Sequence, residues 1–196
     1  MTADLLERWL EAVLATPGAT GLASAEDARR VLLDDAVRAV SVVDSISGPI
    51  VDVGSGGGSP GIPLAAALPA RRFTLLEAER RKCAHLSRFA AELPNAEVVC
   101  GRAEEQPVET FGVALAKALA KPPVAAELCL PLVTTGGAAI LWLGPTADRR
   151  ALELAAEQVG GRFESESAGI AVVRKVAATP RGFPRRAGMA KKRPLG

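Results

Sequence analysis

The chain has 196 residues, of which 48% are hydrophobic, and this composition excludes a disordered or fibrous protein and predicts one globular domain with its own core. The N-terminus carries acids and lacks the apolar core of a signal peptide, and no stretch approaches the ~20 apolar residues of a membrane span, so we expect a cytoplasmic protein without a membrane partner. The net charge is +2, but residues 174–196 hold eight basic residues and no acid, which leaves −6 for the rest of the chain. A basic tail favours a polyanionic partner, although a merely solvated terminus would have the same composition.

Apolar residues at helical spacing predict a first helix over residues 3–15, which Pro17 and Gly18 end. A second helix is expected from the cap residue Ser24 to Val40. Residues 49–53 then form a short apolar run that is typical of a buried parallel strand. Four glycines follow among residues 54–58, and Ser59 and Pro60 favour a new helix, with the serine as its N-cap.

Beyond this point strands and helices alternate. We expect strands over 73–77, 96–100, 111–116, 138–143, 162–167 and 170–176, and helices over 78–93, 122–130 and 147–159. Alternation of this kind predicts a parallel sheet covered on both faces, and the last two strands predict an antiparallel hairpin at one edge. The prolines and glycines from Pro180 onward argue against further regular structure.

The predicted organisation has three parts: a short helical segment (1–44), a ligand-binding α/β domain (45–176) and a basic tail (177–196). Cys83, Cys100 and Cys129 lie far apart and without metal-ligand spacing, so we expect three reduced, buried thiols and no metal.

The glycine turn predicts a nucleotide-like ligand, because glycine lets backbone amides approach a ligand closely. The alternative is a glycine-rich surface loop without a ligand. The residues that follow the neighbouring strands argue against this alternative. Glu77 ends the second strand, 23 residues after Gly54, where a carboxylate can accept hydrogen bonds from a ribose diol. Residues 101–105 after the third strand could line an adenine, and Lys117 after the fourth strand could reach the mouth of the same cleft.

Two cofactor classes can be compared at this turn. A dinucleotide pattern on Gly56, Gly58 and Gly61 starts two residues too late after the strand and contains Pro60. The run from Asp52 to Gly58 agrees better with the turn of methyltransferases that use S-adenosylmethionine, whose sheets also close with an antiparallel strand. We therefore expect a Rossmann-like class I methyltransferase with a mostly parallel seven-stranded sheet.

The stretch from Asp52 to Ala65 closely resembles the signature of the RsmG (GidB) family, bacterial enzymes that methylate N7 of a guanine in the 530 loop of 16S ribosomal RNA. The Ser-Pro-Gly-Ile-Pro exit of the turn is more specific than its glycines. Further similar segments follow at residues 75–77, 101–105, 130–137, 172–175 and 179–195, so the resemblance covers about residues 45–196. The Asn-Leu-Thr and His-x-x-Asp-Ser motifs of the N-terminal region are missing, and Lys117 and Leu143 replace a usual arginine and lysine.

The resemblance implies S-adenosylmethionine as cofactor, S-adenosylhomocysteine as product, and 16S ribosomal RNA or the small ribosomal subunit as partner of a monomeric enzyme. Lys117 and Arg102 are the candidates for the guanine pocket, with Arg174 as a weaker third. The candidate cofactor-binding residues are Asp52, Gly54, Ser55, Gly56, Gly58, Glu77, Ala78, Arg102, Ala103, Glu104 and Lys117. The candidate RNA-binding residues are Arg80, Arg81, Lys82, Arg174, Arg181, Arg185, Arg186, Lys191, Lys192 and Arg193.

Guanine N7 carries a lone pair and no proton, so its methylation needs positioning and no general base. The single histidine, His85, is accordingly interpreted as a surface or helix-packing residue. Two alternatives stay open at this point: a paralogue with the same cofactor and another RNA or small-molecule substrate, and a non-catalytic RNA-binding module with the same fold.

Overall fold

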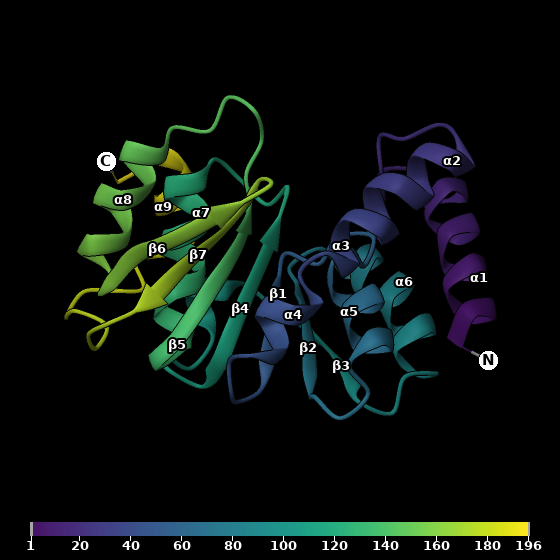
Figure 1. Cartoon of the computed structure of the whole chain (residues 1–196), viewed down its shortest axis with the longest axis horizontal. Helices are drawn as coiled ribbons and strands as arrows, with labels where there is room; N and C mark the ends of the chain where they lie inside the picture. Colours follow the sequence, from purple (N-terminus) through teal and green to yellow (C-terminus); the bar gives the residue numbers. More distant parts are fainter. Residues whose placement is uncertain (1, 196) are drawn as a thin grey trace.

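The computed structural model describes residues 2–195 and has a seven-stranded sheet as its middle layer, in the order β3-β2-β1-β4-β5-β7-β6. Helices lie on both faces of this sheet (Figure 1). Strands β1 to β5 pair in parallel and β7 runs antiparallel to both of its neighbours, which confirms the predicted fold class. The strands are β1 (Ile50–Val53), β2 (Phe73–Glu77), β3 (Ala96–Cys100), β4 (Phe111–Lys117), β5 (Val133–Trp142), β6 (Gly161–Ser167) and β7 (Ile170–Lys175).

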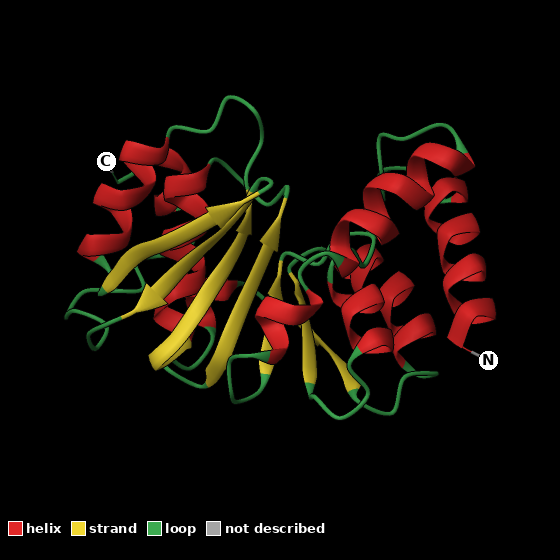
Figure 2. Cartoon of the chain, in the orientation of Figure 1, coloured by secondary structure: helices red, strands yellow, loops and turns green. Residues whose placement is uncertain are grey.

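Two groups of helices flank the sheet, one within residues 2–90 and the other within residues 122–192 (Figure 2). The helices are α1 (Thr2–Ala15), α2 (Ala25–Ala28), α3 (Asp35–Val37), α4 (Val40–Asp44), α5 (Gly61–Ala67), α6 (Arg80–Ala90), α7 (Pro122–Cys129), α8 (Arg149–Gln158) and α9 (Met189–Lys192), with a π-helix η1 (Arg29–Asp34) and the 3-10 turns η2 (Ala103–Glu105) and η3 (Leu130–Leu132).

Alternating side chains along the strands build two cores, because successive residues of a strand point to opposite faces. Leu75 and Leu115 belong to the core beneath α1, α5 and α6, whereas Leu76 and Ala114 belong to the core beneath α7 and α8. Residues of β1, β2 and the middle of β4 are buried, as a parallel sheet covered on both faces requires. Within residues 2–195, no helix is both long and apolar enough to cross a membrane.

The predicted second helix begins as expected and then breaks up. Ser24 Oγ accepts a hydrogen bond from the Asp27 amide, 3.0 Å away, and so caps the helix. From Arg29 the chain widens into the π-helix η1 before α3 and α4 continue it. In a widened turn, carbonyl groups can turn toward partners outside the helix, and the carbonyl of Leu32 accepts a hydrogen bond from the Ser59 hydroxyl. A single helix over residues 24–40 is therefore wrong.

The helix after the glycine turn also starts differently from the prediction. Ser59 is not its N-cap: the Ser59–Pro60 peptide bond is cis, Pro60 occupies the cap position, and α5 begins at Gly61. The first amide of the helix is instead bonded by Asp52, whose Oδ2 lies 3.1 Å from the Gly61 nitrogen. A buried carboxylate from the preceding strand thus replaces the local cap.

Strand β5 starts at Val133, earlier than residue 138, and runs through the glycine pair 136–137. A Cβ at Gly137 would lie 2.2 Å from the Gly112 carbonyl oxygen, so glycine permits the close approach of β4 at this irregular pairing.

The cysteines depart from the prediction as well. Cys83 and Cys100 form a disulfide that joins α6 to the end of β3, so the expectation of three reduced thiols is wrong. Cys129 is free and buried, and burial raises the pKa of its thiol. The two bonded sulfurs come from neighbouring elements whose approach spacing alone does not reveal.

The tail contains one further regular element, contrary to expectation. The short helix α9 packs its buried Ala190 into the core beneath α7, and Phe183 and Leu195 contact the same core. Apolar residues among the tail's prolines and basic residues therefore dock it onto the domain.

Candidate functional site

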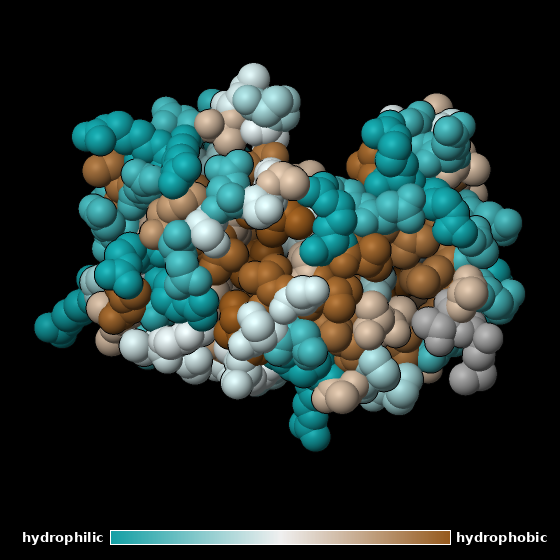
Figure 3. Space-filling model, in the orientation of Figure 1, coloured by the Kyte–Doolittle hydropathy of each residue, from teal (hydrophilic) through white to brown (hydrophobic). Residues whose placement is uncertain are grey.

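A cavity of about 520 Å³ lies at the carboxyl ends of β1, β2 and β4. This is the point where the strand order reverses around β1, the usual ligand position in open α/β sheets. The surface is hollowed over this end of the sheet (Figure 3). The cavity has the size of small-molecule sites, which span ~300–1,000 Å³.

The glycine turn forms the floor of the cavity. The amides of Gly54 and Ser55 both donate to the Leu76 carbonyl at the end of β2, over 2.8 and 3.1 Å. Gly54 and Gly56 have φ values of +70° and +56°, in the left-handed region that favours glycine. Trp9 of α1 supports the turn from outside, because its Nε1 donates to the Gly57 carbonyl over 2.7 Å. The turn is thus fixed on two sides and presents backbone to the cavity.

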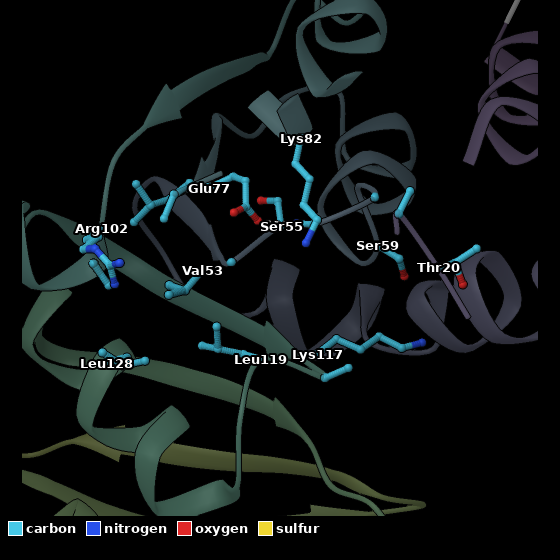
Figure 4. A pocket seen from close by; sticks show the side chains of 18 of the residues that line it. Thr20, Val53, Ser55, Ser59, Glu77, Lys82, Arg102, Lys117, Leu119 and Leu128 are labelled. Carbon is cyan, nitrogen blue, oxygen red and sulfur yellow. Dashed lines mark hydrogen bonds between the residues drawn. The ribbon is translucent and has the colours of Figure 1, made fainter. Parts of the chain in front are cut away.

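Glu77 stands at the centre of the cavity, where Figure 4 shows its carboxylate beside Ser55. Its Oε2 accepts a hydrogen bond from the Gly56 amide at 2.9 Å, and its Oε1 accepts one from the Glu79 amide at 2.8 Å. A carboxylate has about four acceptor positions, so these two bonds aim the group while leaving room for hydroxyl donors from a ligand.

Asp52 lies beneath the turn and does not line the cavity. Its side chain is buried, with the Gly61 amide as a donor. Burial raises the pKa of Asp52 to about 7. Gly58, another predicted cofactor residue, also stays outside the cavity and packs against Ile62 and Trp9. Both residues therefore shape the turn from behind.

The cavity has two distinct ends, which Figure 4 places on opposite sides of Glu77: Arg102 and Leu128 at one, Thr20 and Lys117 at the other. Arg102 follows β3 and Lys117 ends β4, three strand spacings or ~14 Å apart in this sheet. Both cations line the same cavity from opposite ends, and their shared role in a guanine pocket stays a prediction. Ala78, Ala103 and Glu104 do line the cavity, as the sequence predicted, with the last two at the Arg102 end.

Lys117 is engaged rather than free. Its Nζ donates to Asp35 Oδ2 over 2.7 Å and also to the Val31 carbonyl of η1, and its side chain is 10% exposed. This cation therefore ties the N-terminal helices to the end of β4. The sequence pattern does not indicate this ion pair, because Asp35 lies 82 residues from Lys117 along the chain.

The predicted RNA-binding residues fall into two groups. Arg174 sits at the amino end of the parallel strands, paired with Glu164 and with β5 residue Ala138, so its placement near the guanine pocket is wrong. Arg185 forms a bidentate ion pair with the buried Glu127, so its guanidinium is not free to contact a phosphate. The exposed members are Arg80, Arg81, Arg181, Arg186, Lys191, Lys192 and Arg193, and Lys82 is half-buried at the rim.

Several cavity residues were not predicted, and they come from the two ends of the chain. Thr20 and Leu22 enter from the loop after α1, Val31 and Leu32 from η1, and Gly188 from the tail. Their types carry no chemical signal, because small and apolar residues are common everywhere, so only the folded chain identifies them.

His85 is buried on α6 against Phe89, with ring centroids 5.3 Å apart, which confirms its packing role. Burial lowers the pKa of His85, so the imidazole stays neutral near pH 7. In residues 2–195, no group of three His, Cys, Asp or Glu residues is placed to hold a metal ion.

Comparison with known families gives one match that covers most of the chain. The family model described as GidB, rRNA small subunit methyltransferase G, matches residues 2–168. This range includes the N-terminal helices, where the sequence resemblance was weakest, and ends before the basic tail.

The chain is similar to curated proteins named ribosomal RNA small subunit methyltransferase G. One from Synechococcus sp. (strain JA-2-3B'a(2-13)) is 40% identical over 165 residues, which covers 74% of this chain and 64% of the relative. Another, from Synechococcus elongatus, is 36% identical over 174 residues, covering 79% of this chain and 72% of the relative. The chain thus spans about two thirds of the length of these relatives.

Among solved structures, the chain is similar to a TehB-like SAM-dependent methyltransferase from Corynebacterium glutamicum. The TM-score is 0.56 with 14% identity, over 89% of this chain and 97% of the other. At this identity the likeness shows the fold, which is that of Rossmann-like methyltransferases.

Proposed function

The chain belongs to the rRNA small subunit methyltransferase G family, and on this premise we propose that it transfers a methyl group from S-adenosylmethionine to 16S ribosomal RNA. The proposed acceptor is N7 of a guanine in the 530 loop. We further propose that it acts as a monomer in the cytoplasm, and light scattering of the purified protein would test the first of these two statements.

One observation carries the cofactor proposal: the carboxylate of Glu77 is aimed into the cavity by two backbone amides, those of Gly56 and Glu79. A carboxylate fixed at the end of the second strand is suited to a ribose diol. The surrounding residues fit the remaining parts of S-adenosylmethionine. The glycine turn offers a floor formed mainly by backbone, and residues 102–104 offer a polar end for the adenine.

When bound, S-adenosylmethionine would supply a methyl group attached to a positively charged sulfur. The residues of this chain have to orient that group and keep water away from it. Glu77 would hold the ribose, and Leu128 with Ala103 would cover the adenine. Because guanine N7 presents a lone pair and no proton, in-line positioning and desolvation suffice and no general base is required.

Lys117 is proposed to act through the N-terminal helices. Its ion pair with Asp35 and its bond to the Val31 carbonyl hold η1 against the end of β4, and Val31 lines the cavity. Lys117→Met should therefore raise KM for the ribosomal substrate more than it lowers kcat, because it loosens the wall where substrate enters. A loss confined to kcat would contradict this positioning role.

Phosphate contacts are proposed for the exposed basic residues near the cavity. Arg80 and Arg81 start α6 beside the rim residue Lys82, and Lys191 of α9 lines the cavity from the tail. Side chains of this kind bind the RNA backbone and make its affinity depend on salt.

The decisive experiment incubates the protein with methyl-labelled S-adenosylmethionine and small ribosomal subunits from a strain that lacks the modification. Nucleoside analysis should place the label in 7-methylguanosine. A Glu77→Ala variant is the control for a site-dependent reaction. Label in another nucleoside would overturn the proposed acceptor, and absence of label with every RNA substrate would overturn the proposed activity.

A further inference from the structure

The last part of the tail, residues 185–193, contacts the domain at the Arg102 end of the cavity. Gly188, Ala190 and Lys191 line the same cavity as Arg102 and Leu128. Figure 1 shows α9 beside α7, the helix that carries Leu128. A segment that the sequence presents as a basic, proline-rich terminus is thus part of the cavity surface.

A buried ion pair anchors this segment. Glu127 of α7 is 2% exposed, and both of its carboxylate oxygens accept hydrogen bonds of 2.5 Å from the Arg185 guanidinium. A further bond, from Arg185 to the Arg193 carbonyl over 2.8 Å, closes the tail on itself. A buried carboxylate is costly without a partner, so Glu127 holds the tail in one place.

A second contact connects the tail directly to the cavity wall. The Gly188 amide donates to Glu104 Oε1 over 2.8 Å, and Glu104 lies in the turn after β3 that lines the same end. Gly188 has a φ of +81°, and a Cβ there would meet no atom within 4 Å. Glycine is favoured at position 188 because the backbone is left-handed there, and not because a side chain would lack space.

The geometry points to a role of the tail in cofactor retention: residues 185–193 form the outer wall of the adenine subsite. This inference rests on the proposed function, which places the adenine of S-adenosylmethionine between β3 and α7. The tail excludes water from the adenine, and its attachment through Arg185 and Gly188 sets how tightly the nucleoside half is held. The chain therefore uses its basic terminus for the cofactor as well as for RNA.

The chain offers a matched pair of variants for the test. Gly182 and Gly188 both have left-handed φ values, +98° and +81°, and both have open space around the Cβ position. Gly182→Ala and Gly188→Ala therefore impose similar backbone strain on the tail, but only Gly188 lines the cavity and bonds to Glu104. Calorimetric titration of the full chain with S-adenosylhomocysteine compares the two.

We expect Gly188→Ala to weaken S-adenosylhomocysteine binding by about tenfold, equivalent to ~1.4 kcal/mol, and Gly182→Ala to change it less than about twofold. The ligand 5′-methylthioadenosine, which keeps the adenosine and lacks the amino acid, should lose affinity by the same factor in Gly188→Ala. Arg185→Gln provides a second variant with the same expected direction.

If Gly182→Ala, Gly188→Ala and Arg185→Gln all bound S-adenosylhomocysteine with the same affinity, the inference would be overturned. The proposed function would stay intact. An undiminished affinity for 5′-methylthioadenosine in Gly188→Ala would also overturn it, because the wall would then not face the adenosine. Failure of the wild-type protein to bind either ligand would instead overturn the proposed function, and the inference with it.

Discussion

Replacement of Glu77 by glutamine tests the centre of the site. The two carboxylate oxygens accept hydrogen bonds from the amides of Gly56 and Glu79. A glutamine side chain has one acceptor oxygen and one NH2 donor, so one backbone amide would face another donor. Hydrogen bonds to a charged group contribute about 1.5–3 kcal/mol each, and the substituted group would also be less well aimed at the ribose.

The expected consequence is a loss of S-adenosylhomocysteine affinity of roughly 10- to 150-fold, the conversion of about 1.5–3 kcal/mol. Isothermal titration calorimetry measures this loss. Glu79→Gln is the matched control, because Glu79 is exposed, its side chain pairs with Lys82 and Arg81, and it does not line the cavity. Thermal unfolding of both variants without ligand separates a binding defect from a loss of folded protein.

The proposed ribose contact of Glu77 would be refuted if Glu77→Gln folded normally and bound S-adenosylhomocysteine within about twofold of the wild type. A ribose contact elsewhere in the cavity would then be required. The same loss in both variants would refute it too, since the effect would come from the changed charge of the region rather than from the aimed carboxylate.

Gly61→Ala should lower the free energy of unfolding by about 1–3 kcal/mol, because the new Cβ would lie 2.6 Å from Asp52 Oδ2; Gly144→Ala, with no atom within 4 Å, is the control in urea denaturation. Asp52→Asn should flatten the pH dependence of stability. Burial raises the pKa of Asp52 to about 7, whereas the same carboxyl in the unfolded chain loses its proton at about pH 4. The free energy of unfolding of the wild type therefore falls as the pH rises from about 4 to 7, by roughly 4 kcal/mol at most. Replacing Arg181 and Arg186 together by alanine should weaken RNA binding and lower the slope of log K against log salt by ~0.7–0.9 for each phosphate that the protein no longer neutralises.

Each of these three predictions has a contrary result. Equal stability of the two glycine variants would show that the helix start tolerates a methyl group. A pH dependence that persists in Asp52→Asn would assign the titration to another group. An unchanged salt slope would show that the exposed arginines of the tail do not contact phosphate.

Local patterns sufficed for the parts of the fold that depend on neighbouring residues. Strands β2 and β3 have the predicted bounds, 73–77 and 96–100, because each is a short β-rich run between turn residues. The position of Glu77 at the cavity also follows from the sequence, since the end of the second strand is defined by such a run and parallel strands end at one edge.

Contacts between elements that are far apart along the chain were predicted less well from the sequence. Strand β7 lies between β5 and β6, an order that hairpin spacing does not specify. The interruption of the second helix likewise depends on Ser59 and Lys117, which bind carbonyls of η1. Contacts of this kind are set by the shape of the folded chain and leave no periodic signal.

The sequence by itself determined the fold class, the glycine turn and the acidic residue that faces it, because spacing along a strand and a turn is a local property. Only the tertiary structure decided which charges are available. Lys117 and Arg185 show no partner in the sequence, yet each pairs with a carboxylate 82 or 58 residues away. A charge buried on folding needs a partner, and that partner is whichever opposite charge the packing of the helices brings within reach.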